Sequence, residues 1–430
     1  MNKKVDVHHV TRIEGHGNIL VNVQSGVIEQ VEWQVPEAPR FFEAMVRGRS
    51  WEDLQTIVSR ICGICSISHS LACIKGIESA MRIPVSEQTD KLRLLAHYSE
   101  QVQSHVLHVG YLVAPDMLGA KSVIPLVQTH FDVVKTVIQL HRMANSWSDL
   151  LTGRTTHPIT FKPGGFSKIP SETELRGLRA MLSEAVPDLT SLVDVLVSLA
   201  GLLPDFERET EYVALVQPDR YTFYEGSIGS TDMAEATPLT EFESVVNEYV
   251  SPQSTAKWAR WHRDSYAVGA LARYNLNSAY LKPLAKDIAR MFDLETRRHN
   301  PYFNTLAQVV ECAHIVESAL ELIDELLTAG LRQEIPQVEP QAGEGVGCVE
   351  APRGILFHRY VFDDQGRCTS ANMSIPTNQN HGNIQRDMEA LLPQIVDRSE
   401  EEIRLWLEML VRAYDPCISC STHYLHVKFV

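Results

Sequence analysis

The stretch Arg60-Ile61-Cys62-Gly63-Ile64-Cys65-Ser66-Ile67-Ser68-His69 places two thiols three positions apart, with an imidazole four positions further on. A second stretch of this kind lies near the end of the chain, Asp415-Pro416-Cys417-Ile418-Ser419-Cys420-Ser421-Thr422-His423. Thiolates are soft ligands, so the four cysteines would form a four-sulfur metal site if the two stretches meet in space. We therefore expect the intervening residues to fold as a scaffold that brings the two motifs together.

The overall composition restricts the classes of protein to which the chain can belong. It has 430 residues, 44% of them hydrophobic, which is enough for a large core. The formal net charge of −15 at pH 7 disfavours nucleic acid or an anionic membrane surface as a partner. The sequence has no run of about 18 apolar residues, so no transmembrane helix is predicted. The first residues lack the apolar core of a signal peptide. Eight cysteines are too few for a disulfide framework in so long a chain, which favours a reducing compartment.

Hydrophobic periodicity predicts an α+β fold that is mainly α-helical. We expect a single domain over residues 1–430, with a central bundle of long helices and small β-sheets near the N- and C-terminal regions. The termini should converge on a buried metal site. Strands are predicted over 4–35, around 221–224 and over 354–374, a loop over 343–347, and helices over 38–58, 62–81, 86–115, 128–151, 171–203, 240–250, 278–296, 305–327 and 383–413.

The four thiols alone leave more than one kind of site open. A structural zinc site is one candidate, although paired zinc motifs are usually separated by about 15–20 residues and not by most of a chain. An iron–sulfur cluster can also be held by four thiolates. The pairs carry further polar residues that a closed zinc site does not require: Arg60, His69, Asp415 and His423.

Other candidate residues also have simpler explanations. The segment Arg12-Ile13-Glu14-Gly15-His16-Gly17 is compatible with an exposed strand end, and Glu43 with a solvated helix position. His105 and His108 have the i, i+3 spacing of a metal-binding pair, but structural histidines of a helix bundle explain them better.

Taken together, the motifs resemble those of the large, catalytic subunit of nickel–iron hydrogenases. The motifs are, in chain order, RIEGH (12–16), RICGICSISH (60–69), GRTTHPITFKPGG (153–165), VGALAR (268–273), EAPRG (350–354) and DPCISCSTH (415–423). They extend from one end of the chain to the other, and the two CxxC motifs are the most specific. The quinone-site subunit of respiratory complex I shares this ancestry but lacks the four cysteines, so their presence argues against it.

The resemblance implies reversible, heterolytic splitting of dihydrogen at a nickel–iron centre. Cys62 and Cys417 would bind nickel terminally, while Cys65 and Cys420 would bridge nickel to iron. The iron would also carry carbon monoxide and cyanide ligands. Pro352, Arg353 and Thr377 match the positions that surround these diatomic ligands. His69 matches a residue that hydrogen-bonds a bridging sulfur.

The resemblance also implies a path for the proton. The thiolate of Cys417 is the favoured first acceptor, because the guanidinium of Arg353 is normally a permanent cation. Glu14 matches the next proton carrier, a role that suits a positioned carboxyl group. Asp116 and Asp415 match the carboxylates that hold the arginine over the site.

A hard cation is implied near the end of the chain. Glu43, the backbone at Met373 and His423 match its ligands. Oxygen ligands suit magnesium, whereas the imidazole suits iron better, so both ions remain candidates. Members of this family are often cleaved after the matching histidine. The tail 424–430 therefore indicates either an unprocessed precursor or a branch that skips cleavage.

The remaining cysteines cannot form an electron-transfer chain, since Cys73, Cys312, Cys348 and Cys368 are scattered singly. The resemblance therefore implies an iron–sulfur small subunit as a partner, with dihydrogen as the substrate. The motifs CSISH and CISCSTH are most similar to those of the cytoplasmic, multi-subunit bidirectional branch of the family. In that branch, further subunits of flavin, ferredoxin or heterodisulfide reductase type carry the electrons.

Overall fold

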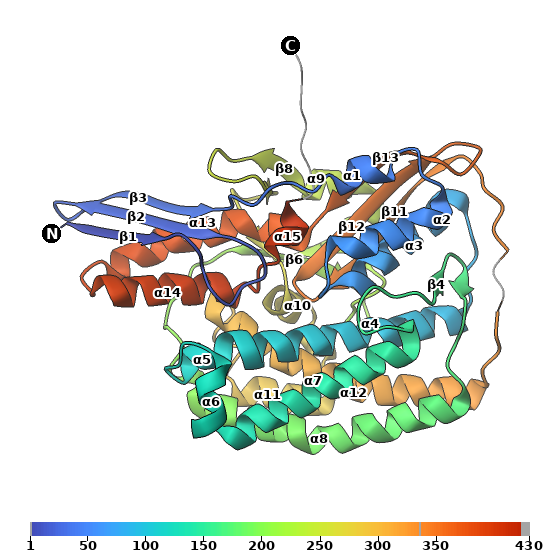
Figure 1. Cartoon of the computed structure of the whole chain (residues 1–430), viewed down its shortest axis with the longest axis horizontal. Helices are drawn as coiled ribbons and strands as arrows, with labels where there is room; N and C mark the ends of the chain where they lie inside the picture. The colour runs from blue at the N-terminus through green and yellow to red at the C-terminus, as the bar shows by residue number, and fades with distance from the viewer. Residues whose placement is uncertain (1, 335–336, 423–430) are drawn as a thin grey trace, which may run out of the picture.

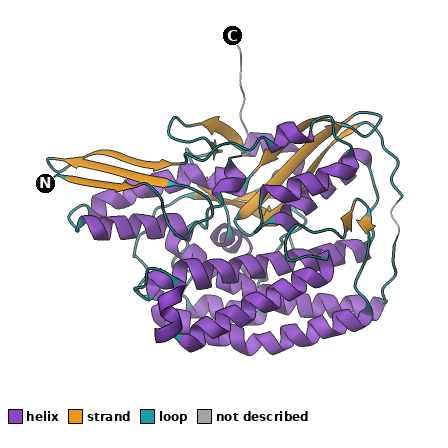
Figure 2. Cartoon of the chain, viewed as in Figure 1, coloured by secondary structure: helices purple, strands orange, loops and turns teal. Residues whose placement is uncertain are grey.

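Long helices form one layer of the molecule, and a layer with small sheets lies above it (Figures 1 and 2). The computed structural model describes residues 2–334 and 337–422. The first layer is built from four helices that pack against one another, α4 (Glu87–Leu107), α7 (Phe131–Thr152), α8 (Glu172–Ala200) and α12 (Asn304–Ala329). This mainly helical α+β architecture confirms the predicted fold class.

Sequence signals explain the boundaries of the bundle helices. Buried residues recur along α7 every three or four positions, so one face of the helix enters the core. Gly153 ends α7 in the left-handed conformation, with φ 74°, that glycine adopts most easily. Ser171 and Glu174 form a capping box at the start of α8. Helix α4 continues as a π-helix (His108–Val113) and the short α5 (Ala114–Met117).

The N-terminal sheet confirms the strands predicted over residues 4–35. Strands β1 (Lys3–Val7), β2 (Asn18–Gln24) and β3 (Val27–Gln34) pair antiparallel in that order. Ile19, Val21 and Val23 on β2 are buried and alternate with less buried neighbours, which is the pattern from which the strand is predicted. The sheet lies against α13 (Pro376–Ile395) and α14 (Glu400–Ala413), beside the C-terminal part of the chain (Figure 1).

A three-stranded antiparallel sheet carries the central part of the second layer. Its strands are β11 (Gly343–Ala351), β12 (Gly354–Phe362) and β13 (Cys368–Ser374), and α3 (Ser66–Met81) covers it. The loop predicted over 343–347 is therefore wrong. The glycines of this segment do not make a turn; they let the backbone of β11 approach that of α3. A Cβ on Gly347 would lie 1.9 Å from the carbonyl oxygen of Ala72.

The middle of the chain differs from the prediction in its short elements. Strands β6 (Glu211–Val216) and β7 (Ser227–Ser230) flank residues 221–224, which are not a strand. The helix predicted over 240–250 is the single turn α9 (Phe242–Val245), followed by a strand. The remaining elements here are β8 (Asn247–Val250), β9 (Lys257–Arg260), β10 (Tyr266–Ala267), α10 (Ala270–Asn277) and α11 (Pro283–Met291).

The helix predicted over 383–413 is two helices, α13 and α14. Ser399 begins α14 with a capping box to Glu402, so the local polar sequence starts a new helix there. The chain then reaches α15 (Ile418–Ser421). The other short elements are α1 (Phe42–Val46), α2 (Trp51–Val58), α6 (Val123–Thr129), β4 (Phe161–Lys162), β5 (Gly165–Phe166) and the 3₁₀ turns Ser59–Ile61, Leu239–Glu241, Ser278–Tyr280 and Pro301–Phe303.

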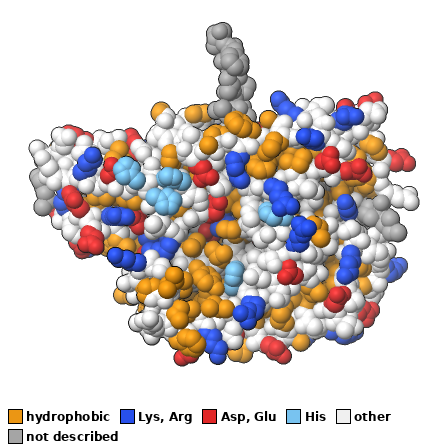
Figure 3. Space-filling model, in the orientation of Figure 1, with side chains coloured by type: hydrophobic (Ala, Val, Ile, Leu, Met, Phe, Trp, Pro, Cys, Tyr) orange, Lys and Arg blue, Asp and Glu red, His pale blue; other side chains and the backbone are white. Residues whose placement is uncertain are grey.

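Exposed hydrophobic side chains gather over α6 and α7, at the lower left of Figure 3. Ile124 is 76% exposed and Phe131 is 60% exposed. Val127 on α6 and Ile138 on α7 are exposed as well. Apolar patches of this kind often mark a surface that another protein covers. Among the described residues, no helix has the length and apolar character needed to cross a membrane.

Candidate metal centre

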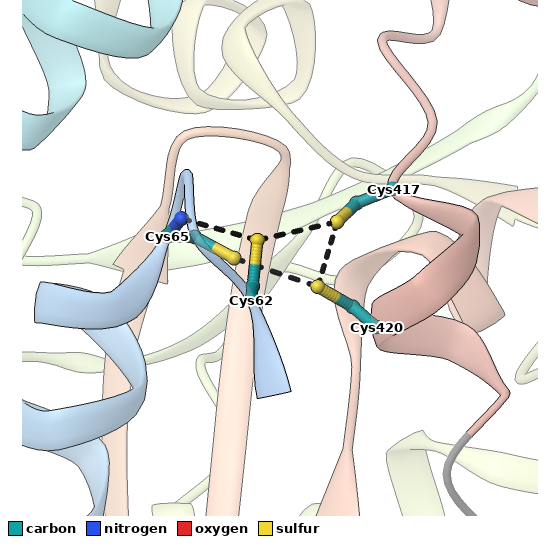
Figure 4. A group of neighbouring side chains, drawn as sticks. All are labelled: Cys62, Cys65, Cys417 and Cys420. Atoms are coloured by element: carbon teal, nitrogen blue, oxygen red, sulfur yellow. Dashed lines mark hydrogen bonds between the residues drawn. The ribbon is translucent and has the colours of Figure 1, made fainter. Parts of the chain in front are cut away.

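The sulfur atoms of Cys62, Cys65, Cys417 and Cys420 meet in the interior of the protein (Figure 4). The Sγ atoms of Cys62 and Cys417 are 3.5 Å apart, and those of Cys65 and Cys420 are 3.6 Å apart. All four Sγ atoms lie within 4.8 Å of one another, and each cysteine is buried. Four thiols at this spacing suit a soft metal ion or a metal pair, so the residues fit such a group.

Local backbone geometry holds each pair of thiols. Cys62 and Cys65 lie between the 3₁₀ turn Ser59–Ile61 and the start of α3, and the sulfur of Cys62 accepts the N–H groups of Ile64 and Cys65 at 3.2 and 3.3 Å. Cys417 precedes α15, and Cys420 lies within it. The two pairs therefore come from opposite ends of the chain, as the sequence predicts.

The thiols differ in how readily they lose a proton. Hydrogen bonding from Cys417 lowers the pKa of Cys62 well below its ordinary value. Burial raises the pKa of Cys417 and that of Cys420. Metal binding requires thiolates, so a cation that enters this cluster must displace protons from the more basic thiols.

A buried arginine lies beside the four sulfurs. Arg353 donates from Nε to the backbone oxygen of Asp415 and from Nη2 to its Oδ1, both at 2.8 Å. Its third nitrogen, Nη1, is buried and has no hydrogen-bond partner in the described chain. A buried donor without a partner is costly, so Nη1 fits a polar ligand that completes the site. Thr377 also lies beside the cluster, where its Oγ1 accepts the N–H of Cys417 at 3.0 Å.

Comparison with known proteins identifies the family. The family model described as nickel-dependent hydrogenase matches residues 40–149 and 216–423, and a model described as HoxL-like matches residues 4–38. The chain belongs to the nickel-dependent hydrogenase family. This membership argues against the two alternatives named above, a structural zinc site and a quinone-site subunit.

Individual relatives agree with the family assignment. This hydrogenase is 31% identical to the sulfhydrogenase 2 subunit alpha of Pyrococcus furiosus, over 98% of this chain and 99% of that one. It is 29% identical to the NAD-reducing hydrogenase HoxS subunit beta of Cupriavidus necator, over 99% and 96% of the two chains. The crystal structure of an NAD+-reducing nickel–iron hydrogenase in the H2-reduced state superposes with a TM-score of 0.89 at 25% identity, covering 98% of this chain and 99% of that one. The chain is a hydrogenase large subunit.

A buried network of charged groups extends behind Arg353 in this hydrogenase. Asp415 accepts from Gln308 at 3.2 Å. Arg273 donates to Glu311, Glu350 and the backbone oxygen of Pro352. Burial opposes ionisation, yet the positive charge of Arg273 lowers the pKa of Glu311 to about 2.

Only some residues of this network could be predicted from the sequence. Arg273 lies in VGALAR and Glu350 in EAPRG, so the motifs could have pointed to both residues. Gln308 and Glu311 lie in a largely apolar helix, where nothing local marks them. His105 and His108 are structural, since they bond to Glu311 and to Gln308, respectively, at 2.8 and 2.6 Å.

The structure corrects the placement of Asp116. This carboxylate does not hold Arg353; it pairs with Arg412, whose Nε lies 2.7 Å from Oδ2, and with Arg12. Asp116 thereby ties the N-terminal RIEGH segment to α14, two elements that flank the cysteine cluster. Among the described residues, Asp415 alone forms an ion pair with Arg353.

Glu14 lies beside the C-terminal cysteine pair. Its backbone forms a parallel bridge with Cys417, and its carbonyl oxygen accepts the N–H of Ile418 at 3.0 Å. Its carboxylate accepts the N–H of Ser419 at 3.0 Å. The RIEGH segment is therefore not simply an exposed strand end.

Two of the three predicted cation ligands come together. Glu43 is only 8% exposed, so it is not a solvated helix position, and its Oε1 accepts the N–H of Met373 at 2.8 Å. The predicted ligand was a backbone oxygen near Met373, whereas the described contact uses the amide. His423 and the tail 424–430 lie outside the described residues.

Glu100 is a buried carboxyl group that local sequence does not reveal. It comes from α4 and accepts the backbone N–H groups of Ile67 and Ser68, at 2.5 and 2.9 Å. These are N–H groups in the first turn of α3, directly after Cys65, so Glu100 caps that helix from a neighbouring element. Burial raises the pKa of Glu100 to about 8.

Proposed function

We propose that this large subunit catalyses the reversible, heterolytic oxidation of dihydrogen at a nickel–iron pair held by its four cysteines. The observation that carries the proposal is the cluster of four buried sulfurs within 4.8 Å, beside an arginine with an unpartnered N–H. The bound metals would supply the polarisation of dihydrogen. Cys62 and Cys417 would be terminal nickel ligands, and Cys65 and Cys420 would bridge the two metals.

The residues around the cysteines would hold the other ligands of iron. Carbon monoxide and cyanide are compact, and cyanide nitrogen needs hydrogen-bond donors in a buried pocket. Nη1 of Arg353 supports this role, because it is buried and unpartnered. The hydroxyl of Thr377 accepts from Cys417 and so keeps its own hydrogen available for a ligand. Pro352, the neighbour of Arg353 in EAPRG, would line the same pocket.

Cys417 would receive the proton that heterolysis releases. Burial opposes the charge of Arg353, but the negative charge of Asp415 raises the pKa of the guanidinium well above its ordinary value, so Arg353 stays a cation. Glu14 would carry the proton onward. Its main chain runs beside Cys417, which supports this role, and its carboxylate accepts the N–H of Ser419.

His69 would donate a hydrogen bond to a bridging sulfur. Glu43, Met373 and His423 would surround a magnesium or iron ion.

An iron–sulfur small subunit would carry the electrons. The other four cysteines are buried singly, so the described chain offers no second cluster of thiols for electron transfer. The relatives named above are subunits by their own names, alpha in one case and beta in the other. The exposed patch of Ile124, Val127, Phe131 and Ile138 also supports a protein partner.

Dye reduction under dihydrogen tests the proposal. The purified complex should reduce a viologen dye, whereas the isolated large subunit should not, because its metal centre has no path for electrons. Cys420→Ser should abolish activity and metal binding in the complex, while Cys312→Ser, at a buried cysteine away from the cluster, should leave both intact. Full activity in the isolated subunit, or in the Cys420→Ser complex, would refute the proposal.

A further inference from the structure

A second set of buried polar residues lies between α3 and β12, next to the metal centre. His69 and Cys73 are one helical turn apart on α3, so they share a face. His358 and Tyr360 are two residues apart on β12, so they also share a face. All four side chains are at most 1% exposed.

These four residues form a continuous hydrogen-bonded chain. Nδ1 of His69 lies 3.1 Å from Nε2 of His358, and Nδ1 of His358 lies 2.8 Å from the hydroxyl of Tyr360. The hydroxyl of Tyr360 is in turn hydrogen-bonded to the thiol of Cys73. The chain therefore runs from a residue four positions after Cys65 into the protein interior.

Proton counting gives the chain a direction. Burial raises the pKa of Cys73 to about 12 and that of Tyr360 well above its ordinary value, so thiol and phenol keep their protons. The imidazole is a stronger acceptor than the thiol, so the hydroxyl of Tyr360 donates to Nδ1 of His358. His358 must then carry its proton on Nε2 and donate to Nδ1 of His69. His69 is left with its own proton on Nε2.

We propose that His358 and Tyr360 are positioning residues that fix the tautomer and ring orientation of His69. The inference rests on the proposed function, in which His69 donates a hydrogen bond to a bridging sulfur. The hydrogen bonds from Tyr360 and His358 hold His69 in the tautomer that carries its proton on Nε2. Only this tautomer has a donor on the ring nitrogen that faces away from His358. Such a bond withdraws electron density from the sulfur, and groups that orient a donor in this way tune the metal.

The alternative is that the four residues merely satisfy one another in the core. The two explanations differ in what the hydroxyl of Tyr360 controls. If it sets the tautomer, its removal changes the electronic state of the centre without loss of metal. If it only fills hydrogen-bonding capacity, its removal changes stability alone.

Infrared spectra of the purified complex provide the test, with nickel and iron content measured in parallel. Tyr360→Phe should retain both metals and shift or split the carbon monoxide and cyanide bands, because His358 loses the donor that selects its tautomer. Cys73→Ala should leave the bands in place, since Tyr360 still donates to His358. Tyr266→Phe is the matched control, a fully buried tyrosine whose hydroxyl bonds instead to Gln379.

A double variant tests the direction of the chain. The side-chain amide of glutamine carries a fixed N–H near the position of Nε2, so His358→Gln can donate to His69 without help from Tyr360. Tyr360→Phe combined with His358→Gln should therefore return the bands towards those of the wild type.

The outcomes separate this inference from the proposed function. Wild-type bands in Tyr360→Phe, no recovery in the double variant, or loss of metal in Tyr360→Phe but not in Tyr266→Phe would overturn the positioning role. Absence of any such bands in the wild-type complex would instead overturn the nickel–iron assignment.

Discussion

The close contact between β11 and α3 offers a test of how the fold sets the metal centre. In Gly347→Ala, the added Cβ would lie 1.9 Å from the carbonyl oxygen of Ala72 and 2.4 Å from the amide nitrogen of Gly76. Ordinary contacts begin at 3.4 Å, so strand and helix would have to separate by about 1.5 Å. Both neighbouring atoms belong to the backbone, so neither can rotate away.

The expected cost follows from this geometry. Overpacking of a core typically costs about 1–3 kcal/mol, and a forced backbone shift lies at the upper end. We therefore expect Gly347→Ala to lower the free energy of unfolding by about 3 kcal/mol. Helix α3 begins directly after Cys65 and β11 leads to Arg353, so the same shift moves thiols relative to the guanidinium. Nickel and iron content should fall as well.

Urea unfolding and metal analysis check this prediction. Gly177→Ala in α8 is the matched control, because no atom lies within 4 Å of the added Cβ. That variant should gain about 1 kcal/mol from the better helix propensity of alanine. If Gly347→Ala unfolds at the same urea concentration as the wild type and keeps its metals, the packing argument for β11 and α3 is incorrect.

Three further predictions concern single side chains. Glu14→Gln should lower turnover at least about 10²-fold with metal content unchanged, as for the loss of a proton carrier; wild-type turnover would exclude Glu14 from the relay. Arg353→Lys keeps the charge but loses the planar fork that holds Asp415, so turnover should fall and the infrared bands should move; unchanged bands would separate Arg353 from the iron ligands. For Glu100, the raised pKa means that the folded state keeps a proton that the unfolded state loses. The free energy of unfolding of the wild type should therefore fall relative to that of Glu100→Gln as pH rises from about 4.5 to about 8, by on the order of 5 kcal/mol. If the two free energies of unfolding change in parallel with pH, Glu100 is not a buried, protonated carboxyl group.

The parts of the fold that the sequence predicted are those with a local cause. Helix α7 follows from its apolar periodicity and its C-terminal Gly153, and α8 from the capping box at Ser171. The union of the two CxxC motifs was also predictable, because four soft thiols in matching motifs need a shared metal to explain them.

The errors have tertiary causes. Glycines over 343–347 suggest a loop locally, but here they serve the approach of two backbones, which only the packed structure reveals. Asp116 has two arginine partners from distant segments, Arg12 and Arg412, and nothing in the sequence around Asp116 indicates either pairing. Glu100 lies in the polar run Ser99-Glu100-Gln101, which suggests an exposed face, whereas all three residues are buried.

X-ray absorption at the nickel edge, with metal analysis of the same purified complex, tests most directly whether the four cysteines hold nickel and iron. We predict equal amounts of nickel and iron, nickel ligated by sulfur at about 2.3 Å by analogy with zinc–thiolate bonds, and loss of that sulfur signal in Cys420→Ser. Zinc as the only metal in the site, or nickel without sulfur ligands, would contradict the assignment.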